Sequence, residues 1–221
     1  MPSPVSDASF CETLRARARS TWDVAVGHRF FREVASDVLT DDVFARYLRI
    51  EYAFIDTAAA ALGYAVAKVP SFQERRRLAL NLHGLVTDQE RFFAEAFDRI
   101  HAPRDQRVGL PPQGGSAALH ELFRSVATTE GYEEILACFL GAEWLYLTWC
   151  SRAHRTPSAR PAIRDWVALH AGGAFAEGVA SLRSELDARG PTLTAARQAR
   201  LGELFERALA AEISFHAAAY G

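Results

Sequence analysis

The chain has 221 residues, of which 49% are hydrophobic and 24% charged, and its 25 Lys and Arg residues nearly balance 27 Asp and Glu residues, giving a formal net charge of -2 at pH 7. This size and composition predict one globular domain over residues 1–221 and exclude a disordered, collagen-like or disulfide-rich chain. The balanced charge also argues against a nucleic-acid partner, which would need a concentrated basic excess.

Cysteine content and apolar stretches bear on the compartment. The three cysteines, Cys11, Cys138 and Cys150, form no CxxC pair, which suits a reducing environment. Met1–Phe10 lacks the basic and apolar regions of a secretory signal, and the longest apolar stretch, around Ala58–Ala67, is far shorter than the roughly 20 residues of a membrane span. We therefore expect a cytoplasmic protein that does not enter a membrane.

Helix signals dominate the first hundred residues. Two capping boxes, Ser9–Glu12 and Ser71–Glu74, mark helix starts, because the serine hydroxyl and the glutamate carboxylate satisfy free backbone N–H groups. Apolar residues recur at helical spacing between Val43 and Ile55, which predicts a helix over about Asp41–Val69. The second capping box predicts another helix, over about Phe72–Ile100.

The second half of the chain continues the pattern after a loop. His101–Gly115 contains three prolines and three glycines and is predicted to be that loop. No alternating run of β-branched residues indicates a strand, so we predict an all-α bundle. The remaining predicted helices begin at Ser116, cover about Tyr132–His154, run from Pro161 to near Gly190, and cover about Thr194–Tyr220.

Three glutamates lie within apolar helix faces. Glu51, Glu143 and Glu212 each have aromatic or aliphatic residues three or four positions away, and such neighbours share a helix face. An ionised carboxylate buried alone costs several kcal/mol, so such a group is paired, protonated or functional. Each glutamate either pairs with an arginine at a helix contact, or all three converge on one polar pocket. In a shared pocket, repulsion and desolvation would raise at least one pKa and suit acid–base catalysis.

Four segments, in order along the chain, match a known pattern of helices. The segments are Trp22 with His28–Phe30, Phe44–Ile55, Glu134–Tyr146 and Glu212–His216. They resemble, in turn, the His-Pro-Phe, the Phe-x-x-Tyr-(hydrophobic)-x-Gln-Asp-x-x-Tyr-Leu, the Leu-Pro-Cys-x-Trp-x-Tyr and the Glu-x-x-Phe-Trp segments of the TenA/thiaminase II family. The resemblance covers nearly the whole chain and implies that family's haem-oxygenase-like bundle, of about seven helices.

The resemblance also implies an activity and a site. Family members hydrolyse aminopyrimidine fragments of thiamin, so we expect a small planar heteroaromatic substrate, an aminopyrimidine, and no cofactor. Glu212 falls on the family's acid–base carboxylate, and His170 stands where the family has a tyrosine. Phe54 and Phe215 are expected to sandwich the ring. The implied substrate-binding residues are Glu51, Phe54, Tyr146, His170 and Phe215.

The family's nucleophile is missing from the aligned position. Its catalytic cysteine falls on Ala142, and alanine cannot add to a pyrimidine ring. Cys138, one turn earlier, and Cys150, two turns later, are expected to be structural thiols. One branch of the family relies on a pocket glutamate instead, and Glu143 adjoins the lost cysteine. We therefore expect Glu212, assisted by Glu143, to catalyse hydrolysis without a covalent thioether.

Two other functions remain open, and both keep the scaffold. Helical bundles with inward Glu and His side chains can hold two metal ions, and Glu212 shares a helix face with His216, so a di-iron or other metal-dependent oxidase is one alternative, although we predict no metal site. The other is a non-catalytic protein that binds a small molecule. The family is usually oligomeric, so we expect a homo-oligomer. Solvated or capping roles are expected for the histidines near predicted helix ends and loops: His28, His101, His120 and His154.

Overall fold

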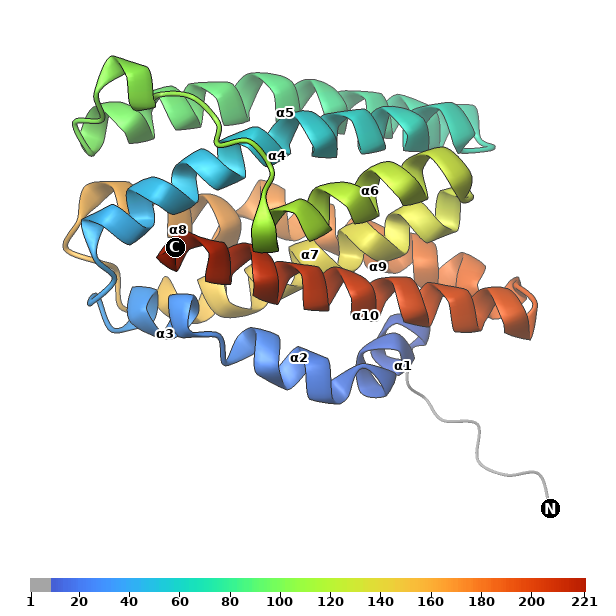
Figure 1. Ribbon diagram of the computed structural model, residues 1–221. Coiled ribbons are helices and arrows are strands. Elements are labelled where there is room, and N and C mark those ends of the chain that lie inside the picture. Colours follow the sequence, from blue (N-terminus) through green and yellow to red (C-terminus); the bar gives the residue numbers. More distant parts are fainter. Residues whose placement is uncertain (1–8) are drawn as a thin grey trace.

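The computed structural model describes residues 9–221, and within that range the chain is helical and contains no strand (Figure 1). The prediction that Met1–Phe10 is not a secretory signal falls largely on residues 1–8, which lie outside the described part. The predicted all-α fold is confirmed. The α-helices are α1 (Phe10–Arg17), α2 (Arg19–Val26), α3 (Arg29–Ala35), α4 (Asp41–Lys68), α5 (Phe72–Arg99), α6 (Ala117–Thr129), α7 (Tyr132–Ala153), α8 (Pro161–Ala171), α9 (Gly173–Arg189) and α10 (Ala195–Ala217).

Side-chain caps start several helices where the sequence predicts them. The hydroxyls of Ser9, Thr40 and Ser71 each accept a hydrogen bond from the backbone N–H three residues later, as expected for N-caps. Both long helices, α4 and α5, therefore begin and end within one residue of their predicted bounds. The predicted loop between α5 and α6 contains two short 3-10 turns, η1 (Arg104–Gln106) and η2 (Gly114–Ser116).

The predicted extent of one helix is wrong. A single helix from Pro161 to near Gly190 is expected, but the chain breaks at Gly172 into α8 and α9. The backbone of Gly172 is extended, with φ -70° and ψ 162°, and a Cβ there would lie 3.0 Å from the carbonyl oxygen of Ala168. The three short helices α1–α3 add further to the total, so the part of the chain described here has ten α-helices rather than about seven.

Helix α7 forms the centre of the core. It packs against α10 along its length and also contacts α4, α6, α8 and α9, and most of its residues are buried. Helices α4 and α5 form a layer on one side, and α1–α3 line the opposite side (Figure 1). This arrangement places side chains from α4, α7, α8 and α10 around a common interior.

Gly141 allows the closest approach between α7 and α10. A Cβ at this position would lie 2.8 Å from the carbonyl oxygen of Phe205 and 2.9 Å from the Cβ of Ala208. We expect Gly141→Ala to lower the free energy of unfolding by about 1–3 kcal/mol, because overpacking outweighs the gain in helix propensity. Gly178→Ala, at a helical glycine whose Cβ would meet nothing within 4 Å, should be neutral or stabilising. Urea unfolding of both variants measures the difference; equal effects would contradict the packing argument.

Helix α4 is, among the described residues, the one helix long and apolar enough to span a membrane. Core helices of globular proteins often have the same composition. Here α4 packs against α5, α6 and α7 and buries a glutamate, Glu51, in the middle of its length. We interpret α4 as a core helix.

Candidate functional site

Two of the three glutamates are buried and influence each other electrostatically. Glu51 on α4 is 7% exposed and Glu212 on α10 is 2% exposed. Burial raises the pKa of Glu51 to about 7. Burial, and then the negative charge of Glu51, raise the pKa of Glu212 to about 8. The two carboxyl groups therefore lie close enough to influence each other, and at neutral pH a proton is held on at least one of them.

Helix α8 supplies polar partners for Glu51. The indole Nε1 of Trp166 donates a hydrogen bond of 3.1 Å to Glu51 Oε2. His170, one turn later, has its Nε2 3.8 Å from Glu51 Oε1, while its Nδ1 lies 2.9 Å from the carbonyl oxygen of Trp166. A carbonyl only accepts, so Nδ1 carries the proton and Nε2 is an acceptor. An acceptor next to Glu51 favours the protonated carboxyl.

A pair of tyrosines lies between α4 and α7. The hydroxyls of Tyr47 and Tyr146 are 3.0 Å apart, and burial raises the pKa of both phenols well above 10. Tyr47 precedes Glu51 by one helical turn, and the charges of Glu51 and Glu212 both act on Tyr146. The carboxyl pair thus adjoins two hydroxyls that stay protonated at neutral pH.

Four buried polar atoms lack a hydrogen-bond partner within residues 9–221. They are His120 Nε2, Trp149 Nε1, Glu212 Oε2 and His216 Nε2. A buried polar atom left unpaired costs about 1–3 kcal/mol, so native proteins rarely keep several. Two of these residues contact the tyrosine pair, because the rings of Trp149 and His216 lie 5.6 Å and 5.4 Å from that of Tyr146. The unpaired atoms of Trp149 and His216 are therefore candidates for polar contacts with a ligand beside the tyrosine pair.

The predicted aromatic pair is arranged differently from the expectation. Phe54 on α4 and Phe215 on α10 contact each other edge to face, with ring centres 5.7 Å apart and planes at 67°. A ring held between two parallel phenyl groups needs about 7 Å, twice the carbon–carbon contact distance. In this arrangement the two rings leave no space for a planar ligand between them, so a sandwich would require the phenyl groups to move apart, and it stays a prediction.

Glu143 is separate from the carboxyl pair in its interactions. It lies on α7, partly exposed, and among the described residues it makes no hydrogen bond or ion pair of its side chain. Burial alone raises its pKa to about 7, whereas Glu212 responds to Glu51. Glu51 and Glu212 therefore influence each other electrostatically. Glu143 has no charged partner among the described residues.

The histidines divide into caps and interior residues. His28 caps α3, with its Nδ1 accepting from the N–H of Phe30, as expected. His120 contradicts the expectation of a solvated or capping role: it is 2% exposed, bonds Thr57 Oγ1 at 2.8 Å, and contacts Phe54 edge-on. Burial lowers the pKa of His120 and His170 to about 4 and that of His216 to about 3.

Sequence reasoning missed His120 because its place near a predicted helix start suggested solvent. The signal was available in its neighbours: Leu119, Leu122 and Phe123 are apolar, and a histidine among them lies on a buried face. It also missed the hydroxyl pairing of Tyr47, which the helical spacing identifies only as a core residue. Such a pairing depends on how two distant helices dock.

The three cysteines are buried and free. Burial raises the pKa of Cys138 to about 12 and that of Cys150 well above its usual value, and the charge of Glu51 also acts on Cys150. Neither thiol is activated as a nucleophile. Ala142 is also buried. Among residues 9–221, no three His, Cys, Asp or Glu side chains are placed to hold a metal ion.

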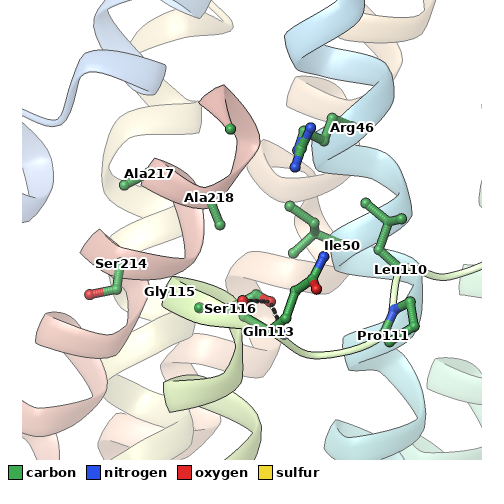
Figure 2. A pocket seen from close by; sticks show the side chains of 12 residues that line it. Arg46, Ile50, Leu110, Pro111, Gln113, Gly115, Ser116, Ser214, Ala217 and Ala218 are labelled. Carbon is green, nitrogen blue, oxygen red and sulfur yellow. Dashed lines mark hydrogen bonds between the residues drawn. The ribbon is translucent and has the colours of Figure 1, made fainter.

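An outer groove lies between α4 and α10, with a volume of about 620 Å³. The loop before α6 crosses it, and Figure 2 shows Arg46 and Gln113 among its lining side chains. The loop is fixed by a hydrogen bond from the N–H of Leu110 to the carbonyl oxygen of Arg49. Gly115 packs tightly on α10, where a Cβ would meet the carbonyl oxygen of Ser214 at 2.5 Å. None of the sequence-predicted site residues lines this groove.

Comparison with known proteins places this geometry in context. The model of the TENA/THI-4/PQQC family matches residues 15–221. No curated protein matches the sequence. A TenA homologue from P. horikoshii OT3 is 17% identical, with a TM-score of 0.86 over 96% of this chain and 99% of that chain.

Two further solved structures are similar in fold. A TenA family transcription regulator from Silicibacter sp. TM1040 is 18% identical, with a TM-score of 0.86 over 96% of each chain. A putative TenA-like thiaminase from Sulfolobus solfataricus P2 is 17% identical, with a TM-score of 0.79 over 98% of this chain and 96% of that chain. At these identities the likeness establishes the fold, as predicted from the sequence.

Proposed function

The chain belongs to the TENA/THI-4/PQQC family, and we propose that it hydrolyses a thiamin-derived aminopyrimidine without a cysteine nucleophile. The observation that carries this proposal is the buried pair Glu51 and Glu212, two carboxyl groups with raised pKa values beside unpaired polar atoms. Paired carboxyls with displaced pKa values are typical of acid–base sites. The resemblance of the sequence to the thiaminase II family supplies the substrate class.

Glu51 suits the edge of an aminopyrimidine. That edge offers an amino donor beside a ring-nitrogen acceptor. A protonated carboxyl offers one donor and one acceptor in the same spacing, and an ionised one pairs with the protonated ring. Glu51 has a pKa of about 7, so both forms are accessible at neutral pH. Trp166 donates to one of its oxygens and fixes the orientation of the carboxyl group.

Glu212 suits the proton transfers. With a pKa of about 8, it is mostly protonated at neutral pH and can donate a proton to a departing amine while the C–N bond breaks. It then takes a proton from the water molecule that forms the new C–O bond, which returns the carboxyl to its starting state. Tyr146 orients that water or the leaving group, and Glu143 assists. Ammonia and the hydroxymethyl product leave, so atoms and charges balance.

Incubation with defined substrates tests this proposal. We expect the protein to release ammonia from aminomethylpyrimidine, and formamide from the formylaminomethyl compound, each with equimolar hydroxymethylpyrimidine. A variant with both Cys138→Ala and Cys150→Ala should keep kcat within about threefold, because neither thiol is a nucleophile. Absence of product with every aminopyrimidine would contradict the proposed hydrolysis, and loss of turnover in the double variant would contradict its cysteine-free chemistry.

A binding protein without catalysis is the second candidate, and Ala142 favours it. The aligned position of the family's nucleophile is an alanine, and one neighbour in fold is described as a transcription regulator. In this case an aminopyrimidine would raise the melting temperature of the protein, as any ligand of the native state does, but would be recovered unchanged. Mass analysis of the ligand after incubation separates the two candidates.

A further inference from the structure

Two histidine side chains lead from the surface to Glu212. His28 caps α3 and is partly exposed. His216 on α10 is fully buried, and its ring centre lies 6.0 Å from that of His28. His216 Nδ1 is 3.4 Å from Glu212 Oε2. Glu212 itself is 2% exposed, so an acid–base role requires some route for protons between this carboxyl and solvent.

Hydrogen bonds define which nitrogens carry protons. Nδ1 of His28 accepts from the N–H of Phe30 at 3.3 Å, so the ring proton is on Nε2. Nδ1 of His216 lies 2.8 Å from the carbonyl oxygen of Glu212 and must donate, which leaves its Nε2 as an acceptor. That Nε2 and Glu212 Oε2 are both buried without a partner within residues 9–221. The His216 ring therefore has a free acceptor at Nε2 and carries a proton at Nδ1, close to the Glu212 carboxyl group.

We propose that His28 and His216 form the route by which Glu212 exchanges protons with solvent. When Glu212 is ionised, the proton on His216 Nδ1 moves to Glu212 Oε2. At the same time His216 Nε2 takes a proton from His28 Nε2 through one water molecule, because ring centres 6.0 Å apart are too distant for direct transfer. His28 Nδ1 takes up a proton from solvent in this step and gives up its hydrogen bond from the N–H of Phe30, so the His28 ring stays neutral. The reverse sequence removes a proton from Glu212, so every step conserves protons.

The surroundings of His216 favour this two-ended transfer over an imidazolium intermediate. Its ring stacks on Tyr47 at 5.3 Å and contacts Phe30 and Phe31, so burial makes a positive charge costly. Simultaneous gain and loss of a proton keeps the ring neutral throughout. Among titratable groups, Tyr47 and Tyr146 contact the His216 ring. The charge of His170 also acts on His216, and that of Glu51 acts on Glu212. Arg32 and Glu33 act on His28.

This inference rests on the proposed function for its kinetic consequence only, because the exchange of protons can be measured without substrate. His28→Asn is the informative variant: asparagine is a good N-cap, so α3 keeps its cap while the titratable ring is removed. His28→Ser, also a capping residue, provides a second variant. His83→Asn, at an exposed position on α5, is the matched control.

The first readout is NMR of protein labelled with 15N in histidine. We expect exchange of the His216 ring proton with water to slow at least tenfold in His28→Asn and His28→Ser, and to stay unchanged in His83→Asn. Equal exchange in all four proteins would overturn the proposed route. Circular dichroism and the melting temperature establish that the variants keep their fold.

The second readout is kinetic. We expect His28→Asn to lower kcat about three- to tenfold with KM unchanged, and added imidazole to restore the rate, because His28 lies at the surface end of the route. Wild-type protein that binds but never turns over would contradict the proposed function and leave the exchange result standing. Normal turnover with unchanged ring exchange would overturn the route while the proposed function stands.

Discussion

Glu212→Gln is expected to lower kcat by about 10²–10⁴, the usual contribution of a general acid–base group. Glutamine keeps the size and shape of the side chain but cannot give or take the proton at neutral pH. We expect KM to change little, because Glu51 rather than Glu212 holds the ring. Steady-state release of ammonia from aminomethylpyrimidine measures both constants.

Controls separate chemistry from folding in this experiment. At pH 8 the variant should unfold at the same or higher urea concentration than the wild type, because a partly ionised buried carboxyl is replaced by a neutral amide. Glu177→Gln, at an exposed position on α9, should keep full activity. Turnover at the wild-type rate in Glu212→Gln would exclude this carboxyl as the acid–base group.

The stability of the protein should fall between pH 6.5 and pH 8. The folded pKa values of Glu51 and Glu212 are raised to about 7 and about 8, so the folded state holds protons that the unfolded state releases near pH 4.5. Stability from such groups is present at low pH and is lost as pH rises through the folded pKa. Glu143, raised to about 7 by burial, acts in the same direction.

The buried histidines act in the opposite direction over a lower range. The pKa values of His120, His170 and His216 are lowered to between about 3 and about 4. Below pH 6.5 the unfolded state therefore binds protons at these histidines, whereas the folded state does not. Their contribution falls as pH drops below 6.5 and offsets the carboxyl contribution between about pH 4.5 and 6.5. Above pH 6.5 only the carboxyl contribution changes, and stability declines.

Comparing the wild type with Glu212→Gln measures how much the ionisation of Glu212 contributes to this loss of stability. Over the 1.5 pH units from 6.5 to 8, ionisation of Glu212 should cost about 2 kcal/mol, at about 1.4 kcal/mol for each unit. Urea unfolding at pH 6.5 and pH 8 should show this loss in the wild type and a loss smaller by about 2 kcal/mol in the variant. A wild type whose stability rises from pH 6.5 to pH 8 would mean that the carboxyls are not buried as described.

The sequence predicts the long helices because their signals are local. Ser71 and Thr40 cap the residues that follow them, and the apolar spacing after Val43 reports one buried face, so α4 and α5 are found within a residue. The break at Gly172 was missed, since a glycine within an amphipathic pattern is compatible with a continuous helix. Only the docking of α8 and α9 onto α7 selects the extended conformation there.

The site is predictable in part for a similar reason. A glutamate on an apolar face must be buried, and Glu51 and Glu212 are. Which buried carboxyls meet depends on the rotation of each helix about its axis. Neighbours on α7 differ by about 100° for each residue, which is why Glu143 could not be assigned to the pair from spacing. The tautomer of His216 likewise follows from a backbone contact within the folded helix.

Calorimetric binding of an aminopyrimidine to two variants tests most directly whether the site is the buried carboxyl cluster or the outer groove. We expect one site per chain in the wild type, at least a hundredfold weaker binding in Glu51→Ala, and unchanged binding in Arg46→Gln, whose side chain lines only the groove. Binding that survives Glu51→Ala but is lost in Arg46→Gln would contradict the account and place the ligand in the outer groove.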